Sequence, residues 1–149
     1  MKPRQSEALF RFFFSLIFLA LGLEHLFSDQ LIQAMMPTWM PMKRFFSMGS
    51  GCVLLLGGTS ILLGYKVRWG ALLLGLFLIG VTATIHGPAL FHVPTDLDPH
   101  WHWLWQVYQR SNFVKNLCLL GGCFHFYNHS VGPYSLESWL YRRKKHPHP

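Results

Sequence analysis

Apolar residues occur along this chain in long runs rather than in the short alternating patterns of water-exposed helices and strands. Four runs approach the roughly 20 apolar residues with which a helix crosses a hydrocarbon core of about 30 Å. They cover residues 8–27, 45–64, 69–91 and 113–128. The last run is the shortest, and it spans the core only with little tilt or with polar ends that reach the headgroups. The pattern predicts an all-α, polytopic membrane protein with four transmembrane helices in one bundle.

Composition agrees with a membrane location. Hydrophobic residues make up 51% of the 149 residues and charged residues only 13%, about half of the roughly 25% charged residues of soluble domains. Glycines recur in the second, third and fourth runs, and small residues let transmembrane helices approach closely. We expect the whole chain, residues 1–149, to form a single membrane domain.

A short additional helix is predicted between the third and fourth runs. Asp98 followed by Pro99 is a typical N-cap with proline at the first helical position, which favours a helix over about residues 99–111. Its aromatic rings prefer the headgroup level of a membrane, where the ring is buried and its polar edge stays wet. We therefore expect an outer interfacial helix anchored by four residues: Trp101, Trp103, Trp105 and Tyr108.

The histidines of the same stretch suggest a metal site as an alternative. His100 and His102 are the nearest candidates, but two residues apart on a helix they would point about 200° from each other. Neither an HxxxH pair nor an HExxH pattern accompanies them. Haem held between His25 and His86 is physically possible, but no attachment motif is present. We expect neither a metal nor haem.

The distribution of basic residues predicts the orientation. The net charge is +7, and the N-terminal segment, the loop at residues 66–68 and the tail at residues 141–149 are all basic and fall on one side. Positively charged loops favour the cytoplasmic side, so both termini are expected there. The tail is a polybasic segment next to the bilayer, suited to anionic lipid. Since these charges lie beside a membrane and no recognition motif accompanies them, nucleic acid is not an expected partner.

Ionisable residues at the ends of the spans are the candidate functional groups. A charge inside a span costs a few kcal/mol or more, so such residues face the bundle interior or the interface and find partners there. Glu24 with Lys115 is one expected ion pair. Either these groups only lock the helices together, or they bind a ligand or transfer protons. The candidates, all expected at the outer side, are Glu24, His25, His86, His92, Lys115 and Asn116.

The order of motifs resembles the DoxX family of four-helix bacterial membrane proteins. The matching segments are "GLEHLF", "GGTSILLGYKVRWGALLL", "HGPALFH" and "QRSNFVKNLCLLGG", and the resemblance covers Leu9 to about Cys123. Its most specific part is the Phe-x-Lys-Asn-Leu-x-Leu-Leu-Gly-Gly pattern of residues 113–122. The positions that match the family pattern are Arg11, Gly22, His25, Gly58, Gly64, Arg68, His86, Lys115, Asn116, Gly121 and Gly122.

The resemblance implies a multi-pass protein of the bacterial inner membrane, but two classes of function stay open. Relatives include a subunit of a membrane thiosulfate:quinone oxidoreductase, so one class is a redox-associated subunit that binds a quinone or a similar molecule near the outer face. The other is a non-catalytic scaffold, assembly factor or carrier. Expected partners are a periplasmic or membrane redox protein, or further copies of the chain. One departure is Leu54, where relatives often carry a glutamate: if that acid serves proton or quinone chemistry in relatives, this chain either lacks that activity or uses Glu24 instead.

Overall fold

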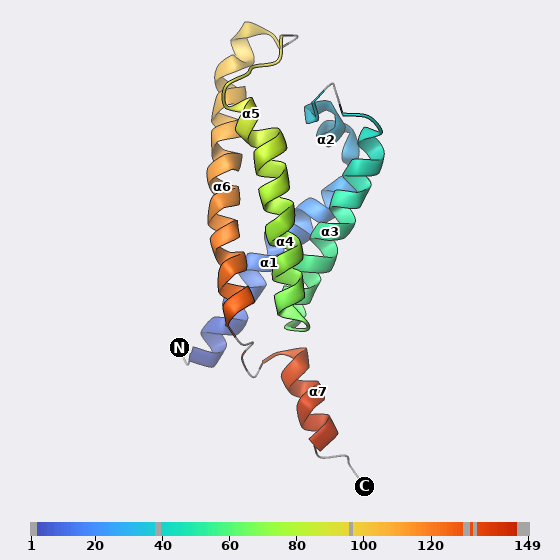
Figure 1. The fold of residues 1–149 in the computed structure, drawn as a ribbon, viewed down its shortest axis with the longest axis vertical. Coiled ribbons are helices and arrows are strands. Elements are labelled where there is room, and N and C mark those ends of the chain that lie inside the picture. Colours follow the sequence, from blue (N-terminus) through green and yellow to red (C-terminus); the bar gives the residue numbers. More distant parts are fainter. Residues whose placement is uncertain (1–2, 38–39, 96, 130–131, 133, 146–149) are drawn as a thin grey trace.

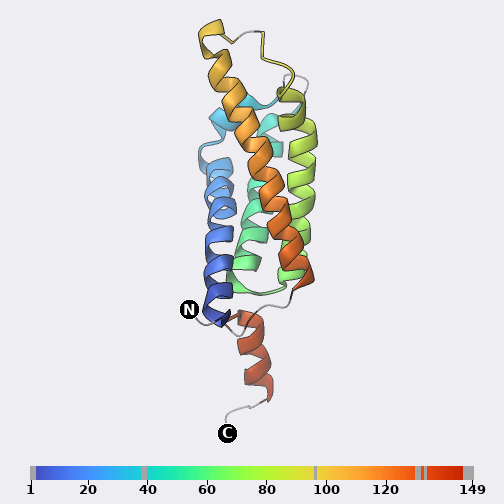
Figure 2. The same ribbon diagram turned by 90° about the vertical axis from the view of Figure 1, so that its left-hand side faces the viewer.

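The computed structural model describes residues 3–37, 40–95, 97–129, 132 and 134–145. Within these residues all regular structure is helical. The long helices lie side by side along the length of the molecule (Figures 1 and 2). They are α1 (Pro3–Phe27), α3 (Lys43–Leu63), α4 (Val67–Val81) and α6 (His102–Asn128).

Shorter elements cover the two ends of the bundle (Figure 1). At one end, called the α2 end here, lie α2 (Asp29–Met35) and the last turns that continue α4. At the other, the α7 end, lie the turn from α3 to α4 and α7 (Leu136–Lys145). The remaining elements are the π-helix η1 (Thr82–His86), α5 (Gly87–Ala89) and the 3-10 turn η2 (Pro99–Trp101).

Three of the predicted spans are confirmed as helices long and apolar enough to cross a membrane. They are Gln5–Phe27, Lys43–Leu63 and Val67–Ala89. In the described part of the chain α6 does not reach the same apolar character, although its 27 residues give it ample length. The structure therefore supports a multi-pass protein in a lipid bilayer, with side chains such as Phe13, Leu56 and Leu76 exposed on its surface.

The prediction of a separate interfacial helix over residues 99–111 followed by a fourth helix over 113–128 is wrong in its division. The Asp98 side chain caps the start, accepting a hydrogen bond of 2.8 Å from the His100 N–H, as predicted. From His102 onward, however, one helix continues to Asn128. No glycine or proline interrupts it around Ser111, and the Asn112 amide bonds the Tyr108 carbonyl within the helix.

Two further helices were not predicted. The seven-residue α2 follows α1 directly, and its apolar run is too short to stand out beside the spans. The predicted basic tail, residues 141–149, continues α7 as far as Lys145, while residues 146–149 lie outside the described part of the chain.

A tight turn joins α3 to α4 at the α7 end. Gly64 ends α3 in the left-handed conformation, with φ of 64°, which costs glycine little because it has no Cβ. The Tyr65 N–H bonds the Ser60 carbonyl across this turn at 3.0 Å. Such a short connection makes α3 and α4 antiparallel neighbours.

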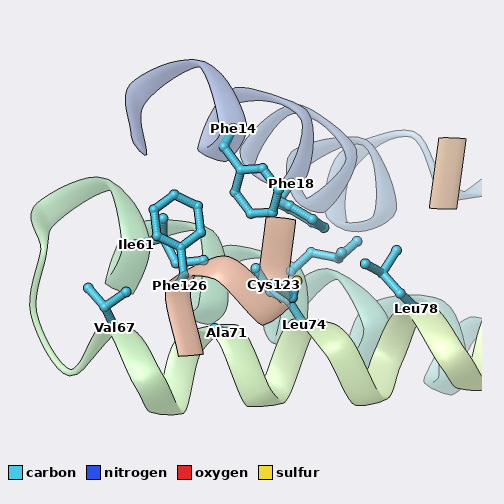
Figure 3. Packing of buried hydrophobic residues seen from close by; sticks show 10 residues of the cluster. Phe14, Phe18, Ile61, Val67, Ala71, Leu74, Leu78, Cys123 and Phe126 are labelled. Carbon is cyan, nitrogen blue, oxygen red and sulfur yellow. The ribbon is translucent and has the colours of Figure 1, made fainter. Parts of the chain in front are cut away.

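The packed core lies between the long helices, toward the α7 end. Phe14 and Phe18 of α1 point at residues from the other three helices (Figure 3). The ring of Phe126 on α6 is 4.9 Å from that of Phe10 and 5.0 Å from that of Phe14, centroid to centroid, which joins α6 to α1. The buried apolar set is Phe14, Phe18, Leu54, Ile61, Val67, Ala71, Leu74, Leu78, Cys123 and Phe126.

Glycines allow the closest helix contacts. A Cβ on Gly57 of α3 would meet the Leu74 side chain of α4 at 2.5 Å, and a Cβ on Gly51 would meet the Gly22 carbonyl of α1 at 3.0 Å. Van der Waals packing of this kind holds transmembrane helices together, because lipid offers no hydrophobic drive between them.

Candidate functional site

A cavity of about 300 Å³ lies at the α2 end of the bundle, among α1, α3, the end of α4 and α6. We call it the α2-end cavity. Its wall is largely apolar, with Leu21, Leu54, Phe77 and Leu119 among the lining residues, and the segment after α1 contributes Ile32, Met36 and Met40. Five of the predicted candidates also line it: Glu24, His25, His86, Lys115 and Asn116.

His86 is held by a side-chain hydrogen bond to the helix opposite. Its Nδ1 lies 2.8 Å from Oε1 of Gln109, a residue of α6 that is only 1% exposed. Because an amide oxygen can only accept, the ring donates from Nδ1, and Nε2 of the neutral imidazole is left as an acceptor. His86 is thus fixed in one tautomer at the edge of the cavity.

The π-helix η1 sets the position of His86. Its wider turn is marked by the hydrogen bond from the Gly87 N–H to the Thr82 carbonyl, five residues back. Pro88 follows and has no N–H to continue the α-helical ladder. Single π turns of this kind occur often at functional sites.

His25 is tied to α3 in a similar way. Its Nδ1 lies 3.2 Å from the hydroxyl oxygen of Ser47, and that hydroxyl lies 3.3 Å from the His25 carbonyl. Ser47 is fully buried. The two histidines are therefore each oriented by a buried polar side chain of a neighbouring helix.

Two polar groups of α6 complete the site. The Asn116 amide donates to the Thr82 hydroxyl at 3.1 Å, which links α6 to η1. The Lys115 ammonium donates to the side-chain Oδ1 of Asn112 at 2.6 Å, one turn back on the same helix. Lys115 is half-buried and Asn116 buried, so both are positioned rather than free in solvent.

The expected ion pair between Glu24 and Lys115 is wrong. Within the described residues these two side chains line the same cavity, yet Lys115 bonds Asn112 and no contact within 4.0 Å joins it to Glu24. Among the residues that the structure describes, the ion pair found within this distance joins His125 to Glu7. Glu24 is exposed on α1, where water can solvate its carboxylate.

His92 and the two metal candidates lie outside the cavity wall. His92 is exposed and its ring contacts the Pro88 carbonyl at 3.2 Å. The His100 ring packs edge-on against Trp101, and Nε2 of His102 lies 3.0 Å from the Leu97 carbonyl. Among the described residues no group of three or more metal-binding side chains converges.

The aromatic residues predicted as anchors divide into two environments. Trp101, Trp103 and Tyr108 are 48%, 59% and 42% exposed, and Tyr108 also lines the cavity. Trp105 is less exposed, and in the described structure its buried indole N–H finds no acceptor.

The residues that hold the site in place were largely missed by the sequence analysis. Gln109 and Asn112 were not predicted. They precede the predicted Asn116 by seven and four residues, so the three form one polar face of a continuous helix. The predicted break after residue 111 hid that face. No comparable signal marks Ser47 or Thr82, since single hydroxyl residues are common in apolar helices.

Comparison with known proteins gives one match. The DoxX family model matches residues 7–87, which is more than half of the chain and includes α1, α3, α4 and η1. No curated protein and no solved structure matches. The Phe113–Gly122 pattern and the cavity residues of α6 therefore lie beyond the matched range.

Proposed function

This chain belongs to the DoxX family, and from that premise we propose that it is a redox-associated membrane subunit that binds a quinone in the α2-end cavity. A similar small molecule with a polar head and an apolar body would fit the same description. The activity itself would belong to a complex with a membrane or periplasmic redox protein.

The observation that carries this proposal is the meeting of polar groups from different helices in a mainly apolar cavity. His25 comes from α1, His86 from η1, and Lys115 with Asn116 from α6. Ligand sites combine an apolar wall with a few well-placed polar groups, in volumes of roughly 300–1,000 Å³. At about 300 Å³ the cavity suits a single ring and the start of its tail.

The hydrogen-bonding capacity of the site matches both forms of a quinone. Lys115 and Asn116 carry N–H donors for the carbonyl oxygens of the oxidised form. Neutral His86 keeps Nε2 as an acceptor for a hydroxyl of the reduced form. A histidine is also the side chain that most readily exchanges protons near neutral pH.

The acid that many relatives carry in the second span is absent. Leu54 lies at that position, is buried, and lines the cavity. Glu24 is the carboxylate among the described lining residues. We therefore assign any proton exchange to Glu24, His25 and His86 rather than to α3.

We propose that α6 is a fourth membrane crossing. Its 27 residues extend about 40 Å at 1.5 Å per residue, longer than a hydrocarbon core of about 30 Å. Its polar side chains face the cavity or bond neighbours, as Gln109 and Asn116 do, which explains its low apolar character. The excess length carries Trp101 and Trp103 into the outer headgroup region.

The orientation follows from the charges at the two ends. Arg68, Arg142 and Lys144 lie at the α7 end with other cations, and fewer lie at the α2 end. By the preference of basic loops for the cytoplasm, we place the α7 end and both termini inside and the cavity near the outer face. For a bacterial chain the membrane would be the inner membrane.

Quinone retention tests the proposal. The full-length protein is purified in mild detergent from quinone-containing membranes, and bound quinone is extracted and quantified by mass spectrometry per mole of protein. His86→Ala and Lys115→Ala each remove one hydrogen-bonding group, which we expect to lower retention about tenfold. His92→Ala is the matched control, because His92 lies outside the cavity, and it should retain quinone as the parent protein does.

Equal quinone content in the parent, His86→Ala and His92→Ala proteins would refute binding in the cavity. So would the absence of quinone from a parent protein that also fails to take up an added short-chain quinone. Helix content and monodispersity of each variant, measured beforehand, separate loss of ligand from loss of fold.

A non-catalytic scaffold is the second candidate, supported by the exposed apolar surface of Trp101, Trp103 and Val107. In that case the cavity would be empty in the purified protein. A soluble redox enzyme would instead copurify with the parent protein and be lost in Trp103→Ala.

A further inference from the structure

A second cavity, of about 430 Å³, lies at the α7 end of the molecule, and we call it the α7-end cavity. Its lining includes two cationic side chains, Lys66 and Arg68, together with His129. Glu137 is the carboxylate among its described lining residues. The cavity therefore carries net positive charge before any histidine is protonated.

The backbone around this cavity is fixed by unusual local geometry. Lys66 adopts the left-handed conformation, with φ of 50°, directly before the first turn of α4. No side chain caps that turn. The N–H of Glu137 bonds the Gly64 carbonyl at 3.3 Å, which holds the start of α7 against the turn between α3 and α4. The start of α7 and the turn between α3 and α4 thus meet at the wall of the cavity.

A buried cation lies behind the wall of the cavity. Arg11 of α1 is 2% exposed and donates to the Tyr134 carbonyl. Its Nε and Nη1 groups find no acceptor among the described residues. The Nη1 atom of Arg11 and the Cβ atom of Ser135 both lie against Gly64, and Ser135 lines the cavity.

Glu7, one helical turn before Arg11, is a carboxylate whose negative charge acts on the guanidinium. Its carboxylate lies 4.0 Å from the His125 imidazole, and within the described residues no ion pair includes Arg11. The cations Arg11, Lys66 and Arg68 nevertheless outnumber the carboxylates Glu7 and Glu137 in and behind the cavity wall. An external anion in the cavity would offset that excess of positive charge.

We propose that the α7-end cavity binds a phosphate-bearing anion. Lysine and arginine side chains are the usual partners of phosphate oxygens, and the uncapped start of a helix adds N–H groups and a positive dipole end. Trp69, which lines the cavity and is 71% exposed, marks the headgroup level, where tryptophan prefers to lie. The site is thus placed for the headgroup of an anionic phospholipid, and free phosphate has the same chemistry.

Lipid retention by the full-length protein tests this proposal. The protein is reconstituted in nanodiscs of phosphatidylcholine with one quarter phosphatidylglycerol, released, and weighed by native mass spectrometry to count retained anionic lipid. Lys66→Gln with Arg68→Gln removes two lining cations, and we expect about fivefold weaker retention for each. Lys144→Gln with Lys145→Gln removes the same charge from exposed positions of α7 outside the cavity and should retain lipid as the parent does.

A change of opposite sign provides a second test. Glu137→Gln removes the carboxylate of the cavity, so it should raise phosphatidylglycerol retention severalfold. Because Lys66, Arg68 and Glu137 are all exposed, these variants are expected to fold, and helix content verifies this.

The source of the phosphate is decided by competition. If inorganic phosphate at millimolar concentration displaces phosphatidylglycerol, or raises the melting temperature of the parent but not of the Lys66→Gln, Arg68→Gln protein, the cavity takes free phosphate as well. Equal lipid loss in both double variants would mean general attraction to the basic end and would overturn the proposal. Unchanged retention in the Lys66→Gln, Arg68→Gln protein would also overturn it. The cavity is remote from the proposed quinone site, so either proposal can fail alone.

Discussion

The two halves of this bundle are built from the same long helices but differ in how those helices pack. Toward α7, the helices meet through aromatic rings such as Phe14 and Phe126 and through apolar side chains such as Ile61 and Val67. Toward α2, the same helices meet through His86, Gln109 and Asn116 around a cavity. Dense apolar contact stabilises the first half, whereas the second leaves polar groups held in place around empty space. The difference separates the part that keeps the helices together from the part that can bind a ligand.

The largest expected effect is a core truncation in the α7 half. Phe126 is 2% exposed and its ring contacts those of Phe10 and Phe14. Phe126→Ala should lower the free energy of unfolding by about 3–5 kcal/mol, because the cavity left between rigid helices cannot close fully. Unfolding in mixed detergent micelles measures this change. Phe124→Ala, two residues earlier and 60% exposed, is the control and should change little. A similar loss in both variants would mean that the two faces of α6 do not differ in packing.

An intermediate effect is expected from one added methyl group between α3 and α4. A Cβ on Gly57 would meet the buried Leu74 side chain at 2.5 Å, so Gly57→Ala should cost about 1–3 kcal/mol through overpacking. Gly80 has nothing within 4 Å of the same position. Gly80→Ala should therefore be neutral or stabilising by up to about 1 kcal/mol, since alanine favours helix. Melting temperatures in detergent compare the two variants. A lower melting temperature for both would show that the space beside Gly80 is occupied in the purified protein.

The smallest stability effect is expected at the cavity itself. Gln109→Leu removes the acceptor of the His86 N–H, but His86 borders the cavity and water there can replace the bond. We expect a loss of only about 1 kcal/mol, measured by unfolding in mixed micelles. If Gln109 must orient His86 for the quinone to bind, quinone retention in the same variant should fall severalfold although its stability changes little. Unaltered retention would show that Gln109 has no positioning role.

The spans could be predicted because lipid imposes a simple requirement on sequence. Runs such as residues 8–27 and 45–64 are long and apolar, and the helices Pro3–Phe27 and Lys43–Leu63 contain most of them. Residues 102–128 were divided in two because tryptophans at one end and polar residues in the middle look like a boundary. In the structure two of these polar groups, Gln109 and Asn116, are buried and bonded to η1 across the bundle. Hydropathy along the sequence cannot show a partner on another helix.

The candidate site was predicted in its residues but not in its contacts. His25, His86, Lys115 and Asn116 were found because embedded ionisable and amide groups are rare, and five of six candidates line one cavity. His92 was grouped with them because it is near in sequence, yet it lies beyond the last turn of the third span. The partners Ser47, Gln109 and Thr82 depend on how the helices are rotated about their axes, which depends on packing across the whole bundle.

The widened turn at Thr82–His86 has a consequence for the phase of the third span. Each residue of a regular helix advances about 100° around the axis, and the extra residue in this turn shifts everything beyond it by about that angle. Making the turn regular at its present length would swing the His86 ring away from Gln109, whereas removing one residue, such as Ala83, together with the wide turn would leave the ring facing Gln109. The wide turn therefore sets the direction of the imidazole as much as the identity of the residue does, and the same sequence in a regular α-helix would present a different side chain to the cavity.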